Sequence, residues 1–99
     1  MSERRKFTDY EKKTIYANGN GRCGICGKPI NYSAMTVDHK IPLSKGGTNG
    51  FDNLQPACLT CNLLKGSLTM PELINQVNGI LRHNTHLKIK YFFTKEAIR

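Results

Sequence analysis

Two pairs of cysteines, each with two residues between its members, constrain this chain more than any other feature. The pairs are Cys23 with Cys26 and Cys58 with Cys61, and residues 27–57 separate them. Thiolates are preferred ligands of Zn²⁺, and four of them complete a closed tetrahedral shell that leaves no position for a substrate. The spacing therefore predicts a structural zinc site that fastens two distant segments together.

The chain is short and basic. It has 99 residues, of which 38% are hydrophobic and none is tryptophan. One domain with a modest core is expected, and a bound metal would add stability. The formal net charge is +8, from 15 Lys and Arg against 7 Asp and Glu, and zinc bound by four thiolates would leave +8 − 4 + 2 = +6. This charge favours a polyanionic partner such as nucleic acid, although a basic surface alone does not require one.

No segment predicts export or membrane insertion. The N-terminal residues MSERRKFTDYEKK carry charges without an apolar core, so they do not resemble a secretory signal. No apolar run approaches the length of a transmembrane helix. We therefore expect an intracellular, cytoplasmic protein with no membrane partner. In such a reducing compartment, paired CxxC cysteines favour metal binding over disulfides.

Caps, glycines and apolar residues predict a small α+β fold, with residues 1–99 as a single domain. The expected elements are a helix over about 8–17 capped by Thr8, a short strand over 34–37, a second strand or turn over 53–58, and a helix over 59–65 that Gly66 ends. Residues 40–52 are expected to form a loop.

The C-terminal third predicts one more helix. Thr69 and Glu72 form a capping-box pattern that starts a helix over about 70–82. Its apolar residues recur at helical spacing and are expected to pack on the core. They are Leu73, Ile74, Val77, Ile80 and Leu81. The tail LKIKYFF, residues 87–93, fits either an edge strand or part of a helix.

An acid and a histidine stand side by side in TVDHKIPLSKGG, residues 36–47. Adjacent side chains of a strand point to opposite faces, so Asp38 and His39 can serve one site only where the strand ends and the backbone turns. The proline and two glycines that follow permit such a turn. Histidine accepts a proton near neutral pH, and carboxylate or amide oxygens suit Mg²⁺ or Mn²⁺.

The stretch CGICGKP…VDHKIPLSKGGTNGFDNLQPACLTCNLLKG, over about residues 22–66, resembles the HNH endonuclease family. The shared elements occur in order: CxxC, DHxxP, GG, an NL pair, and CxxCN with a following lysine. The resemblance implies a ββα-metal (His-Me finger) nuclease core with a structural four-cysteine zinc site and flanking helices. It also implies an endonuclease that hydrolyses DNA with the help of a divalent cation.

The resemblance implies a role for each site residue. Asp38 and Asn62 would be ligands of a catalytic Mg²⁺ or Mn²⁺, and His39 would be the general base. Asn53 would order the loop between the strands and support the histidine. Asn62 is a departure from the colicin-type motif, because it stands where the last histidine of that motif stands. The implied products carry 5′-phosphate and 3′-hydroxyl ends.

Basic residues near this site are candidate contacts to the DNA backbone: Lys40, Lys45 and Lys65. Phosphate contacts give affinity without sequence information, and no element resembles a reader of base edges. We therefore expect weakly specific nicking or cutting. Lys65 also suits a second interpretation, because a cation near the C-terminal end of a helix is favourable.

Two other functions fit part of the sequence. A zinc-stabilised nucleic-acid-binding module without catalysis would explain the cysteines and the charge, but not the set of Asp38, His39, Asn53 and Asn62. A rubredoxin-like electron carrier would explain the segment CGICGKP, with iron bound in place of zinc. It would leave the net charge of +8 unexplained.

Overall fold

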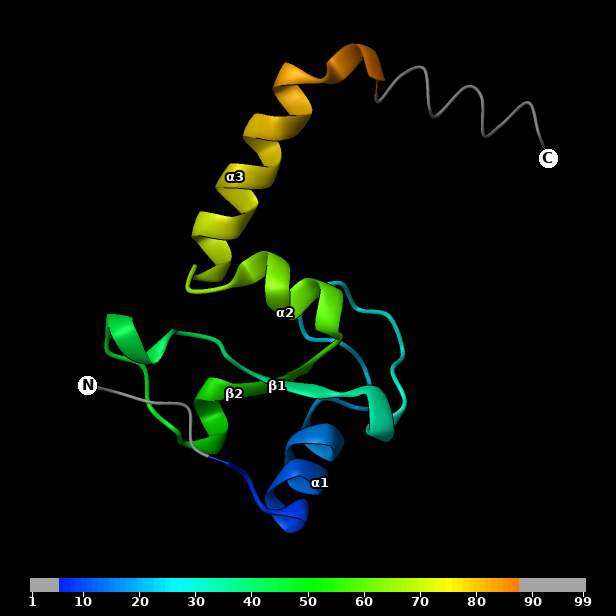
Figure 1. Cartoon of the computed structure of the whole chain (residues 1–99), viewed down its shortest axis with the longest axis vertical. Coiled ribbons are helices and arrows are strands. Elements are labelled where there is room, and N and C mark those ends of the chain that lie inside the picture. The colour runs from blue at the N-terminus through cyan, green and yellow to red at the C-terminus, as the bar shows by residue number, and fades with distance from the viewer. Residues whose placement is uncertain (1–5, 88–99) are drawn as a thin grey trace, which may run out of the picture.

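The computed structural model describes residues 6–87, which form a small α+β fold around a two-stranded antiparallel sheet. Strand β1 spans Thr36–His39 and strand β2 spans Leu54–Ala57. Helix α1 (Asp9–Asn18) lies on one side of the sheet and helix α2 (Leu59–Lys65) on the other (Figure 1). Together β1, β2 and α2 make the ββα arrangement that the sequence predicted.

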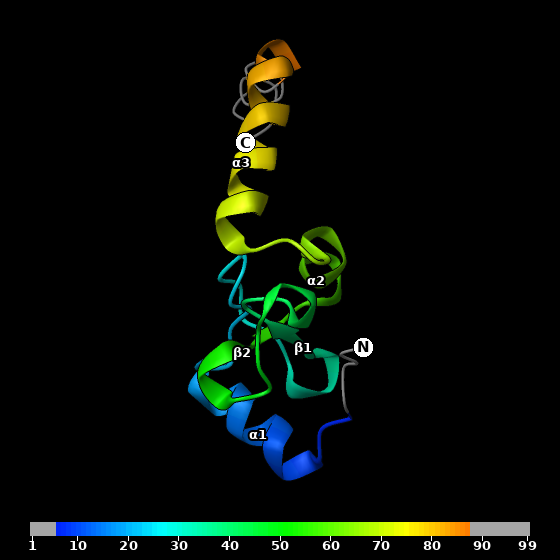
Figure 2. The same ribbon diagram turned by 90° about the vertical axis from the view of Figure 1, so that its left-hand side faces the viewer.

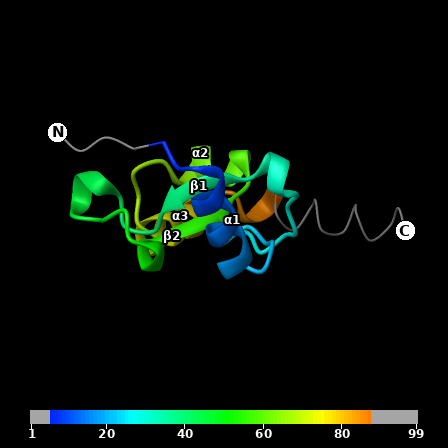
Figure 3. The same ribbon diagram turned by 90° about the horizontal axis from the view of Figure 1, so that it is seen from below.

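Helix α1 begins at the cap that the sequence indicated. The Thr8 side chain accepts a hydrogen bond from the Glu11 amide, and the Glu11 carboxylate accepts one from the Thr8 amide. Viewed from below, α1 lies in front of both strands (Figure 3). Its buried residue Ile15 joins Val37 and Leu54 in a small core. The buried apolar residue of α1 therefore packs against both strands of the sheet.

Strand β1 differs from its prediction in where it starts and ends. A turn of 3₁₀ helix at Tyr32–Ala34 occupies the expected start, so strand pairing begins at Thr36. The strand continues through Asp38 and His39, which are its last two residues. In the antiparallel register, Asp38 is opposite Gln55. The acid and the histidine thus belong to the strand itself, at its end.

The connection between the strands is a loop that contains two short 3₁₀ turns, Leu43–Lys45 and Phe51–Asn53. Helix α2 follows β2 directly, with Cys58 as its N-cap residue and Gly66 after its last turn. The expected bounds of this helix, 59–65, are confirmed.

Helix α3 (Met70–His83) starts with the expected capping box, in which Glu72 and Thr69 exchange side-chain hydrogen bonds with each other's amides. It extends away from the sheet, as two perpendicular views show (Figures 1 and 2). Leu73 is buried, but Ile74 and Ile80 are about half exposed, at 52% and 50%. The prediction that this apolar face packs on the core is therefore wrong beyond Leu73. The period of apolar residues predicts a face, but it cannot say whether anything covers that face.

Beyond Leu87, the tail that was expected as a strand or helix lies outside the described residues. Among residues 6–87, no helix combines the length and apolar character that crossing a membrane would need.

Candidate functional site

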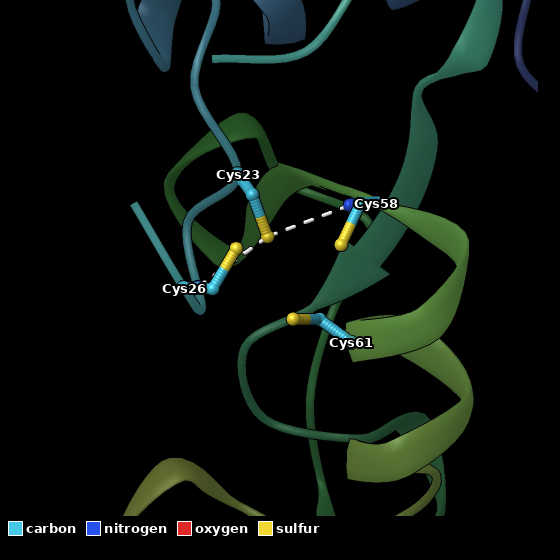
Figure 4. Close-up of side chains that lie close together, drawn as sticks. All are labelled: Cys23, Cys26, Cys58 and Cys61. Atoms are coloured by element: carbon cyan, nitrogen blue, oxygen red, sulfur yellow. Dashed lines mark hydrogen bonds between the residues drawn. The ribbon is translucent and has the colours of Figure 1, made fainter. Parts of the chain in front are cut away.

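The four cysteines meet at one point between the turn after α1 and the start of α2 (Figure 4). Their four Sγ atoms all lie within 4.8 Å of one another. A tetrahedral ion with Zn–S bonds of about 2.3 Å brings its sulfurs to within roughly 4 Å of one another. The four thiols are therefore positioned to hold one metal ion, and their chemistry fits Zn²⁺.

Backbone amides prepare Cys23 for this role. Burial acts to raise the pKa of the Cys23 thiol, but three amide groups donate to its sulfur and outweigh burial, so that the pKa falls to about 6. The donors are the amides of Cys26, Cys58 and Ile25, at 3.4–3.5 Å. Burial and the neighbouring thiols raise the pKa of Cys61. The thiolate form that a metal requires is thus favoured at Cys23 before a metal binds.

Asp38 points from the sheet toward α2 and is only 3% exposed. The Lys65 ammonium lies 3.2 Å from each of its carboxylate oxygens, and the Gln55 amide donates to Oδ2 at 2.9 Å. Lys65 also donates to the backbone carbonyl of His39 at 2.8 Å. The carboxylate is therefore held in one orientation by a cation and an amide that are themselves buried.

This arrangement corrects the interpretation of Lys65 as a contact to DNA. The residue is 1% exposed, and its ammonium is engaged by Asp38 and by the end of β1. An ammonium enclosed in this way is not available to a phosphate at the surface. Nothing in the sequence marks Asp38 as the partner of Lys65, because the two residues meet only in the folded structure.

His39 lies on the opposite face of β1, beside Phe7, with the ring centroids 6.3 Å apart. Its Nε2 is 2.8 Å from Oδ1 of Asn49. An amide oxygen can only accept, so this bond requires the proton on Nε2 and leaves the lone pair on Nδ1. Nothing in the sequence marks Asn49 as a partner of His39, because an asparagine in the run GGTNG has the composition of an ordinary turn.

Asn53 ties the loop between the strands together. Its side-chain amide donates to the carbonyls of Ile41 and Thr48, and its Oδ1 accepts from the Ile41 amide at 2.9 Å. The Asn53 carbonyl accepts from the Lys40 amide. These bonds fix both ends of the loop that carries Asn49.

Asn62 sits in the middle of α2 and reaches back to the sheet. Its side-chain amide donates to Oγ1 of Thr36 at 2.8 Å, and no hydrogen bond to its Oδ1 occurs among residues 6–87. Thr36 and Asp38 alternate with Val37 along β1, so Asn62 and Asp38 approach the same face of the strand. Cys58 and Cys61 lie at the start of α2, so a metal held by the four cysteines would fix the helix that carries Asn62.

Asp38, His39 and Asn62 line one cavity of about 890 Å³. We call it the cleft; α1 contributes Lys12, and Ser44 comes from the loop. Asp38 and His39 point to opposite faces of β1, but they are its last two residues, and both therefore border the cleft.

The other two candidate DNA contacts lie outside the lining of the cleft. Lys40 is exposed, whereas Lys45 forms an ion pair with Glu72 at 2.6 Å. The Lys45 ammonium lowers the pKa of the Glu72 carboxyl to about 2, with further help from the Thr69 amide.

The four cysteines thus lie beside a ββα unit whose residues Asp38, His39 and Asn62 line one cleft. Residues 23–68 match the family model of the HNH endonuclease. The resemblance to this family is therefore confirmed over a segment that includes the four cysteines, Asp38, His39 and Asn62.

A solved structure described as a type II restriction endonuclease is similar in fold, with a TM-score of 0.56 at 19% sequence identity. The similarity covers 77% of this chain and 43% of that chain, so this chain spans less than half of that protein. The likeness supports the fold. The search of curated proteins found no match.

Proposed function

We propose that this chain is a metal-dependent endonuclease that hydrolyses phosphodiester bonds of DNA. The observation that supports the proposal is the cleft, which is lined by Asp38, His39 and Asn62 from the segment that matches HNH endonucleases. The net charge of +8 supports a polyanionic substrate. The cysteine cluster is proposed to hold a structural Zn²⁺, which a zinc content of one per chain would support.

The donor atoms in the cleft fit a hard divalent cation. Asp38 and Asn62 would hold Mg²⁺ or Mn²⁺ through a carboxylate and an amide oxygen, the donors that such ions prefer. Thr36 engages the amide nitrogen of Asn62, and this favours the oxygen as the free donor. When bound, the ion would neutralise charge on the scissile phosphate and on the departing oxygen.

His39 would activate the attacking water. In our proposal the water transfers a proton to Nδ1 as its oxygen forms a bond to phosphorus, and the bond from phosphorus to the 3′ oxygen breaks. The departing oxygen takes its proton from solvent, which gives a 5′-phosphate and a 3′-hydroxyl. Asn49 supports this step because its oxygen accepts from Nε2 and would stabilise the protonated ring.

Supercoiled plasmid offers the direct test of this function. We expect the protein to convert plasmid to nicked or linear forms with Mg²⁺ or Mn²⁺ and not with EDTA. His39→Ala should reduce this rate by about 100-fold or more, since general-base catalysis typically contributes that much. His83→Ala is the matched control, because His83 is an exposed histidine outside the cleft. Equal cutting by the wild type and His39→Ala would overturn the proposed role of His39.

A zinc-stabilised nucleic-acid-binding module without catalysis is the second candidate. One observation favours it: Lys65 and Gln55 already engage both oxygens of Asp38. If neither the wild type nor His39→Ala cuts plasmid while both bind DNA, this second function replaces the first.

A further inference from the structure

Two adjacent lysines of α1, Lys12 and Lys13, have different surroundings. Lys13 forms an ion pair with Asp9 at 2.9 Å, one helical turn earlier. The Tyr32 hydroxyl and the Lys13 ammonium both bind the Asp9 carboxylate and lower its pKa. Lys12 lines the cleft, and no ion pair to it occurs among residues 6–87. Consecutive helix residues point about 100° apart, which explains why only one of the two faces the cleft.

The balance of charge in the cleft favours an anion. Its charged or titratable lining residues are Lys6, Lys12, Asp38 and His39. The charge of Asp38 is balanced by Lys65, which is buried behind it. The exposed lysines of the lining therefore leave a net positive field in the cleft, in which a phosphate would be attracted.

We propose that Lys12 binds a backbone phosphate of DNA next to the phosphate that is cut. The proposal rests on the proposed function, because it takes the cleft as the place where the DNA strand lies. Helices α1 and α2, which both contribute residues to the lining of the cleft, lie on opposite sides of the sheet (Figure 1). A strand that crosses the end of β1 would meet Lys12 before or after it meets Asp38 and His39.

Lys12 in this role positions the substrate and reads no bases. A lysine–phosphate contact releases a condensed counterion and carries no sequence information. The contact should therefore strengthen binding to every DNA sequence alike, and it should respond to salt.

The test compares Lys12→Gln with Lys13→Gln, both in the His39→Ala background and without added divalent cation. Binding of a fluorescein-labelled DNA duplex is measured by anisotropy across a series of salt concentrations. We expect Lys12→Gln to reduce the slope of log K against log [salt] by about 0.9, the value for one phosphate contact. Lys13→Gln should leave the slope unchanged, and Lys12→Arg should restore it.

Equal slopes for Lys12→Gln and Lys13→Gln would overturn the proposal. Both side chains are exposed and glutamine is a good helix former, so both variants should fold, which circular dichroism checks. A reduced slope for Lys12→Gln in a protein that never cuts plasmid would support the phosphate site while rejecting catalysis. Plasmid cutting together with equal slopes would reject the phosphate site alone.

Discussion

Helices α2 and α3 follow each other in the chain, yet the rest of the molecule holds them very differently. Helix α2 has 7 residues and no side-chain N-cap bond, and α3 has 14 residues and a complete capping box. Isolated helices as short as α2 are unstable, so local sequence signals favour α3. Nevertheless α2 is fixed against the sheet, while most of α3 extends away from it (Figure 2).

The difference lies in long-range bonds. Helix α2 begins at the cysteine cluster, where the Cys58 amide donates to Cys23 Sγ, and Lys65 joins its other end to Asp38. Helix α3 has the buried Leu73 and the ion pair between Glu72 and Lys45. Because Asn62 belongs to α2, these ties also set the geometry of the cleft. In a chain this small, the placement of α2 is set by contacts distant in sequence, at the cysteine cluster and the buried ion pair, more than by the helix itself.

Loss of the metal should have the largest effect. Cys58→Ser should abolish cooperative folding of residues 23–68, because structural zinc contributes about 10–16 kcal/mol in zinc-finger peptides and a domain is stable by only about 5–15 kcal/mol. Circular dichroism and amide NMR spectra measure this, with Ser67→Ala as a control at an exposed site. A well-folded Cys58→Ser protein without zinc would contradict the account.

Loss of the buried ion pair should come next. Lys65→Met leaves the carboxylate of Asp38 buried without its cation, which should cost about 3–5 kcal/mol of unfolding free energy in urea titrations. The double variant Lys65→Met/Asp38→Asn should recover part of this cost. Lys40→Met is the matched control at an exposed lysine and should change stability by less than about 0.5 kcal/mol. Equal losses of unfolding free energy in Lys65→Met and Lys40→Met would show that the ion pair of Lys65 with Asp38 does not hold α2 in place.

Along α3, truncation of apolar side chains should have unequal effects. Leu73→Ala should cost about 2–3 kcal/mol, at the low end for a buried leucine, since Leu73 is 4% exposed. Ile80→Ala should cost less than about 0.5 kcal/mol, because the residue is 50% exposed. Urea unfolding measures both. A cost for Ile80→Ala that matches Leu73→Ala would mean that the outer part of α3 is covered in solution.

The smallest effect concerns the ion pair at the start of α3. The pKa of Glu72 is lowered from 4.5 to about 2, chiefly by Lys45, so its stabilising contribution is present above about pH 4.5 and is lost as the pH falls through 2. In Lys45→Met, the NMR titration of the Glu72 carboxyl should move up toward 4.5, and Lys40→Met should leave it in place. If the Glu72 carboxyl titrates at the same pH in Lys45→Met as in the wild type, Lys45 and Glu72 do not form this ion pair in solution.

Local signals in the sequence predicted the elements well. Caps at Thr8 and Thr69 and the glycine at 66 marked helix ends, because these effects involve residues only a few positions apart. The cysteine spacing predicted a metal cluster, and its thiols do converge. These features depend on chemistry that can be recognised without knowing the fold.

The partners of the site residues could not be predicted in the same way. Gln55 meets Asp38 through strand register, and Asn49 meets His39 through a loop whose path depends on Asn53. Lys12 and Lys13 are equivalent in sequence, and only the orientation of α1 separates them. Each of these relations joins residues through the folded backbone, which composition and spacing do not describe.

The central claim is that Asp38 and Asn62 share one divalent cation beside His39. It can be tested by adding Mn²⁺ to zinc-loaded, ¹⁵N-labelled protein and following paramagnetic broadening of amide signals. We expect the amides of residues 36–39 and of Asn62 to broaden first, Asn62→Ala to weaken this effect, and Asp52→Asn, at an exposed acid, to leave it unchanged. Broadening centred elsewhere, or unchanged in Asn62→Ala, would contradict the claim.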